Sequence, residues 1–239
     1  MNVSFLKGLA LFVLSSILLI SGCQASGGTE DEAAASETAV DSETESSSDN
    51  HEHSHAHGEE TEEIYNGYFE DSQVDDRPLS DWEGDWQSVY PYLEDGTLDE
   101  VFAHKAEHEG DKTAEEYKQY YKTGYQTDVD RIVIQGNNVT FYRDSEELTG
   151  EYVYDDYEIL NYEAGNRGVR YVFKLKDEAD GLPSYIQFSD HSIYPTEAGH
   201  YHLYMGDDRE ALLDELSNWP TYYPSEMDGH DIAHEMMAH

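Results

Sequence analysis

Three histidines near the end of the chain have the residue type and spacing of a metal site. His200 and His202 are separated by one residue in a β-type run, so both side chains point to the same face of a strand, about 7 Å apart. His191 ends an earlier strand-like run, and the turn-forming residues 195–199 fold it back beside His200. Three neutral imidazoles can hold an ion such as Zn²⁺ and leave the fourth tetrahedral position open.

A series of short strands is predicted to position these histidines. Residues 129–135 and 139–143 flank Gly136-Asn137-Asn138, which is a hairpin signal. Further strands are predicted over residues 151–154, 158–162, 169–175, 184–190 and 200–205. Closely spaced strands joined by short turns indicate an antiparallel meander that closes into a small barrel, so we expect a mainly β fold with accessory helices.

Helices are predicted before and after the strands. Thr97 with Glu100, and Thr113 with Glu116, fit the capping box that begins a helix, and the first helix should end near Gly110. Two more helices are predicted, one from Asp207 or Asp208 through Leu216 and a weaker one over 227–239.

The first residues have the pattern of an export signal. Lys7 precedes an apolar run over residues 8–20, which is short for a membrane span. The run ends in Gly22-Cys23, which is similar to a bacterial lipobox. We therefore expect 1–22 to be a lipoprotein signal peptide and Cys23, the only cysteine, to carry a lipid that anchors the chain to the outer face of the cell membrane.

Residues 23–76 are predicted to be a disordered, acidic tether, because they are rich in Ser, Glu, Asp and Ala and contain no Lys or Arg. His51, His53, His55 and His57 alternate within it, a composition associated with accessory metal binding. The alternative for this tract is a solvated low-complexity segment. The folded domain is expected over 77–239.

The formal net charge is −40, which argues against nucleic acid as a partner and favours attraction of cations. A salt-adapted extracellular protein would be similarly acidic. Charge alone therefore does not assign a metal function.

Several long strings in residues 77–239 resemble the ZinT (YodA) family of zinc-binding proteins. These are RPLSDWEGDWQSVYP from Arg77, GVRYVF from Gly168, YIQFSDH ending at His191, HYH over 200–202 and NWPTYYP from Asn218. The resemblance implies a calycin or lipocalin-like antiparallel β-barrel that follows the tether in the sequence. It also implies a metal triad near the barrel mouth, and His191, His200 and His202 fall on the matching positions.

The function implied by this resemblance is zinc capture outside the cytoplasm under scarcity, without catalysis. Delivery would be to a zinc ABC importer through its substrate-binding protein, and AdcA-type zinc lipoproteins carry a similar C-terminal domain. Imidazole ligands also suit Cd²⁺, Ni²⁺ and Cu²⁺. Because the ligands must be unprotonated, affinity should fall below about pH 6. The fourth ligand stays open between Glu197, Glu235 and His239.

Two other functions fit parts of the sequence. A zinc hydrolase would use the open position, but HEMMAH from His234 has one residue too many for the zincin motif, and no general base is evident. A lipocalin-like small-molecule carrier would need an apolar cavity of roughly 300 Å³ or more. The pairs His104/His108 and His230/His234 have helical metal-pair spacing, although exposed histidines of this kind are usually solvated.

Overall fold

The computed structural model describes residues 61–144, 146–214 and 216–238. The predicted signal peptide, the lipidation site Cys23 and the five accessory metal candidates lie outside the described residues. Those candidates are His51, His53, His55, His57 and His239. Within the described ranges, no helix is long and apolar enough to cross a membrane.

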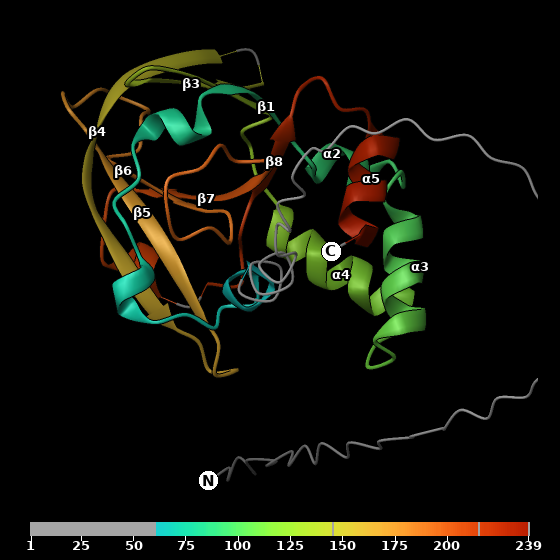
Figure 1. The fold of residues 1–239 in the computed structure, drawn as a ribbon. Helices are drawn as coiled ribbons and strands as arrows, with labels where there is room; N and C mark the ends of the chain where they lie inside the picture. Colours follow the sequence, from blue (N-terminus) through green and yellow to red (C-terminus); the bar gives the residue numbers. More distant parts are fainter. Residues whose placement is uncertain (1–60, 145, 215, 239) are drawn as a thin grey trace, which may run out of the picture. The chain divides into compact units, whose positions relative to one another are not determined.

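Eight antiparallel strands form a closed barrel in sequential order, and the last strand pairs with the first (Figure 1). The strands are β1 (Gly84–Ser88), β2 (Arg131–Gln135), β3 (Asn138–Arg143), β4 (Glu146–Asn161), β5 (Arg167–Leu175), β6 (Tyr185–Ser189), β7 (Tyr201–Gly206) and β8 (Thr221–Pro224). The predicted barrel and the meander of strands that builds it are confirmed.

The strand predictions differ from the structure at three places. Residues 151–154 and 158–162 belong to one long strand, β4, whose register shifts between Tyr154 and Asp156. The bulge keeps the chain extended where the polar pair Asp155-Asp156 suggested a break. Strands β1 and β8 were not predicted, because they are short and contain Gly84 or end in Pro224, residues that weaken a strand signal.

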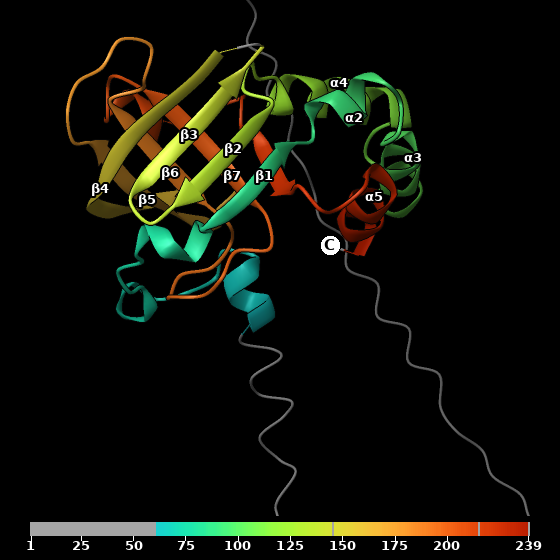
Figure 2. The ribbon, with the colours of Figure 1, turned by 90° about the horizontal axis from the view of Figure 1, so that it is seen from above.

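Four α-helices lie together beside the barrel, on the side of β1 and β8 (Figure 2). They are α2 (Tyr90–Glu94), α3 (Asp99–His108), α4 (Ala114–Tyr125) and α5 (Gly229–Ala238), and short 3-10 turns occur at Asp71–Gln73, Leu79–Trp82 and Ala211–Leu213. Helix α3 packs against both α4 and α5. This arrangement makes a second, helical layer against one wall of the barrel.

The helix-start predictions were half correct. Thr113 and Glu116 form the predicted capping box at the start of α4. Thr97 does not cap α3, because its hydroxyl bonds the Asp95 carboxylate at 2.7 Å instead. The helix predicted through Leu216 is wrong: Asp208 does accept bonds from the backbone that follows, but the helical turn ends before Asp214, whose backbone is extended.

Each layer has its own hydrophobic core, and β8 contributes to both. Tyr222 points into the barrel core, whereas its neighbour Tyr223 packs in the helical core. This follows from the two-residue period of a strand, which sends successive side chains to opposite faces. Strand β8 is therefore the shared wall between barrel and helices.

Residues 61–76, which the sequence analysis placed in the tether, pack on the barrel. Residues 61–65 form a helical turn, and Ile64, Phe69 and Val74 are buried in the barrel core. These apolar residues recur every five positions, a spacing that matches neither a helix nor a strand. That is why the sequence pattern gave no sign of their burial.

Gly124 in α4 allows the helical layer to approach the segment before β8. A Cβ added at Gly124 would lie 2.4 Å from two ring atoms of Trp219, and the Gly124 carbonyl accepts a bond from the Trp219 backbone N–H at 2.6 Å. No side chain larger than hydrogen fits at this contact without movement of the indole.

Replacing Gly124 by Ala should therefore destabilise the protein. Alanine favours a helix by about 1 kcal/mol over glycine, but overpacking of this kind costs typically about 1–3 kcal/mol. We expect a net decrease in the free energy of unfolding, measured by denaturant titration. Thr123→Ala, an exposed change one residue earlier in the same helix, is the control and should not destabilise. Equal stability of the two variants would contradict the close-approach argument.

Candidate metal centre

The structure brings His191, His200 and His202 together at one end of the barrel. One ring nitrogen from each lies within 4.8 Å of the others, and the ring centroids are 5.6 to 6.1 Å apart. A tetrahedral ion with bonds of about 2.0–2.1 Å holds its nitrogens about 3.4 Å apart. Small ring rotations would therefore close the triad around one ion. In the described part of the chain, no other group of three or more His, Cys, Asp or Glu is this compact.

Each histidine is placed by the end of a strand. His202 lies on β7, His200 directly precedes that strand, and His191 follows the end of β6 by two residues. His191 has φ of 64°, the left-handed region that non-glycine residues seldom adopt. This conformation turns the chain sharply at the end of β6. Such local strain is typical of functional sites.

A buried arginine holds the loop that carries His191. Arg77 makes a two-pronged ion pair with Asp190, at 2.6 and 2.9 Å, and also donates to the carbonyl oxygens of Ser192 and Thr196. The guanidinium thus bonds the residues on both sides of His191. Arg77 opens the first string quoted for the family resemblance, but its role was not evident from the sequence.

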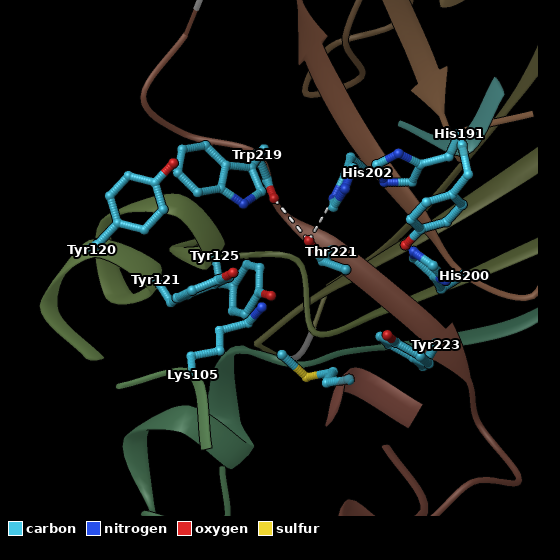
Figure 3. A pocket seen from close by; sticks show the side chains of 12 residues that line it. Lys105, Tyr120, Tyr121, Tyr125, His191, His200, His202, Trp219, Thr221 and Tyr223 are labelled. Atoms are coloured by element: carbon cyan, nitrogen blue, oxygen red, sulfur yellow. Dashed lines mark hydrogen bonds between the residues drawn. The ribbon is translucent and has the colours of Figure 1, made fainter. Parts of the chain in front are cut away.

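Two tyrosines stack on the triad, and Figure 3 shows one of them, Tyr223, beside His200. The Tyr223 ring lies parallel to His200, with centroids 5.0 Å apart and an interplanar angle of 12°. The Tyr65 ring stacks on His191 at 4.5 Å. Flat contacts of this kind restrict rotation of both imidazoles and fix the direction of their nitrogens.

Thr221 fixes the protonation pattern of His202. The two residues are opposite each other on β7 and β8, and the His202 Nδ1 lies 2.7 Å from the Thr221 Oγ1. The Thr221 hydroxyl also lies 3.0 Å from the Trp219 carbonyl oxygen, which can only accept a hydrogen. With its one hydrogen directed to that carbonyl, Thr221 accepts from His202. Nδ1 then carries the proton, and the Nε2 lone pair is available to a metal.

Burial lowers the pKa of His202 well below its ordinary value, and the neighbouring His191, His200 and Arg170 lower it further. The ring is thus held in the neutral form that binds metal. His202 is partly exposed. Its surroundings nevertheless disfavour the protonated, charged imidazole.

A cavity of about 270 Å³ lies beside the triad, between the barrel end and the helices (Figure 3). Besides the three histidines, Tyr65 and Tyr223, it is lined by Lys105, Tyr120, Tyr121, Tyr125, Trp219, Thr221 and Met236. The barrel interior is filled by a packed core that includes Trp82, Tyr171 and Phe188. This cavity therefore adjoins the triad outside the packed barrel core, whereas a lipocalin-like carrier holds its ligand inside the barrel.

The remaining candidate metal ligands in the described residues do not line the cavity beside the triad. Glu197 is exposed on the loop before His200. Glu235 on α5 is near the site, since its charge helps to raise the pKa of Tyr65, after burial as the larger cause. His104 and His108 have ring centroids 4.1 Å apart on α3, and His230 faces Glu100.

Replacing Thr221 by Val should weaken binding of Zn²⁺ by roughly 10–100-fold, the usual effect of removing a partner of a metal-binding histidine. Valine preserves the shape but accepts no hydrogen bond, so Nδ1 loses its partner. Thr221→Ser, which keeps the hydroxyl, is the matched control and should bind nearly as the parent does. The measurement is competition with a zinc-sensitive dye. Unchanged affinity of the valine variant would rule out the tautomer argument.

The lowered pKa of His202 predicts a pH dependence of stability in the metal-free protein. An unfolded histidine takes up its proton near pH 6.5, whereas folded His202 does so at a lower pH. Below about pH 6.5 the unfolded state therefore binds more protons, and the free energy of unfolding falls as the pH falls. His202→Gln should flatten this part of the profile, measured by denaturant unfolding with chelator present. Equal slopes for His202→Gln and the parent would refute the prediction.

Comparison with known proteins agrees with this geometry. A model of the ZinT family, described as ZinT (YodA) periplasmic lipocalin-like zinc-recruitment, matches residues 60–239. The chain is 68% identical, over the whole of both chains, to the probable metal-binding protein YrpE of Bacillus subtilis strain 168. It is 50% identical to the zinc-binding lipoprotein AdcA of Streptococcus pneumoniae R6, over 76% of this chain but 36% of AdcA.

A solved structure supports the same relationship. The fold matches the Zn(II)-bound ZinT-like domain of Streptococcus pneumoniae AdcA with a TM-score of 0.71 and 50% identity, covering 73% of this chain and 97% of that domain. The resemblance noted in the sequence is thereby confirmed. With the family match extending from residue 60 to residue 239, the chain belongs to the ZinT (YodA) family.

Proposed function

We propose that this protein is an extracytoplasmic zinc-binding protein that captures Zn²⁺ through His191, His200 and His202. The observation that carries the proposal is the convergence of three imidazole nitrogens within 4.8 Å, with the tautomer of His202 set by Thr221. The relatives named zinc-binding, and the Zn(II)-bound structure of a 50% identical domain, support zinc as the ion.

The ligand chemistry suits capture and release. Three neutral imidazoles leave a fourth position that faces a cavity of about 270 Å³. A ligand from another protein can enter this cavity and take part in transfer. Because imidazole is a borderline donor, Cd²⁺, Ni²⁺ and Cu²⁺ fit the same triad, and availability contributes to the choice of metal.

Binding without catalysis is supported by the names of the relatives, which are metal-binding and zinc-binding proteins. Hydrolysis at a zinc ion would need a general base beside the open position. Glu235 is the carboxylate near the site, through its charge on Tyr65 and Tyr223, and it is not among the residues that line the cavity.

We also propose the setting in which capture occurs. Residues 1–22 would direct export, Cys23 would carry the lipid, and the histidines of the tether would collect metal. The acceptor would be the substrate-binding protein of a zinc ABC importer. The lipoprotein AdcA supports an anchored location, and the family description supports zinc recruitment outside the cytoplasm. The tether would then end before residue 61, where the described fold begins.

Zinc titration by calorimetry tests the proposal directly. The parent should bind one Zn²⁺ tightly, and the triple variant His191→Ala/His200→Ala/His202→Ala should lose this site, because each substitution removes a nitrogen ligand. A His230→Ala/His234→Ala variant removes two histidines outside the triad and should keep the site. Tight binding retained in the triple variant, with the parent's stoichiometry, would overturn the assignment.

A further inference from the structure

A pair of histidines outside the triad lies in close ring contact on helix α3. His104 and His108 are four residues apart, and their ring centroids are 4.1 Å apart with an interplanar angle of 37°. His104 is partly exposed and His108 is exposed. Residues four apart on a helix share one face, so both rings are accessible from the same side.

The backbone that carries this pair is held in place by packing. Val101 and Phe102 on α3 are buried in the helical core, and α3 packs against α4 and α5. Two imidazoles on a fixed helix need only side-chain rotation to direct one nitrogen each at an ion about 2.0–2.1 Å away. The cost of ordering the ligands is therefore small.

The charges around the pair favour a cation. The one basic residue between the two histidines, Lys105, has its ammonium 3.3 Å from the Glu109 carboxylate, and its side chain lines the cavity of the triad. Glu100 lies one turn before His104, and the chain as a whole carries a charge of −40. A divalent ion at the pair thus meets a negative field.

We propose that His104 and His108 form a second, weaker site for borderline divalent transition metal ions. Two imidazoles leave the remaining positions to water, which suits Cu²⁺ and Ni²⁺ as well as Zn²⁺, with Cu²⁺ held most strongly. The site is independent of the triad and would remain if the proposed function of the triad failed.

The chain contains its own control for this proposal. His230 and His234 have the same spacing on α5. However, His230 Nδ1 lies 3.4 Å from the Glu100 carboxylate, and no ring contact joins the two histidines within the described part of the chain. Comparison of the two pairs therefore distinguishes the effect of the four-residue spacing from the effect of the close ring contact.

The test is protection of individual histidines from diethyl pyrocarbonate by Ni²⁺, read by mass spectrometry on the full chain. In the parent, Ni²⁺ should protect His104 and His108 together. In His104→Gln, the protection of His108 should be lost, and the reverse should hold for His108→Gln, while protection of the triad is unchanged. Circular dichroism shows whether the helices of each variant are intact.

Two results would overturn the proposal. One is that Ni²⁺ does not change the reactivity of His104 and His108 with diethyl pyrocarbonate. The other is protection of either residue that persists when its partner is replaced, since a shared ion requires both. His230 and His234 should show no mutual dependence; if they show the same dependence, helical spacing suffices and the ring geometry is not the cause.

Discussion

The buried ion pair between Arg77 and Asp190 is the interaction on which the barrel end with the histidine triad depends. Both side chains are almost fully buried, so each charge relies on the other and on the carbonyl oxygens that Arg77 bonds. Removing one partner of such a pair typically costs about 3–5 kcal/mol. The guanidinium also lies 4.2 Å from the Trp82 ring centre, which joins the loop of His191 to the barrel core. Placement of His191 is thereby coupled to the packing of the barrel core.

The alternation of β8 explains why the site lies where barrel and helices meet. Thr221 bonds His202, Tyr222 fills the barrel, and Tyr223 stacks on His200 while belonging to the helical core. One short strand thus orients two histidines of the triad and joins the two cores. The triad is therefore part of the contact between the two layers.

The sequence predicted the features that rest on local patterns. The x-His-x-His spacing and the Thr113 capping box depend on residues close in the chain, and the structure contains both the histidine cluster and the cap. The roles of Arg77 and Thr221 depend on partners 113 and 19 residues away, which no periodicity reveals. Thr97 shows that a local pattern can also mislead: its backbone N–H and its hydroxyl both donate to the Asp95 carboxylate, two residues earlier, and the hydroxyl does not cap the helix.

Closure of the barrel between β1 and β8 has a consequence for how the protein matures. These strands stand at opposite ends of the domain sequence, from Gly84 to Pro224, so the ring cannot close until nearly all of the chain is present. Pairings of such long range form slowly. A chain that ends before β8 has His191, His200 and His202 but not the strand that orients two of them. The triad therefore takes its final geometry only after β8 has paired.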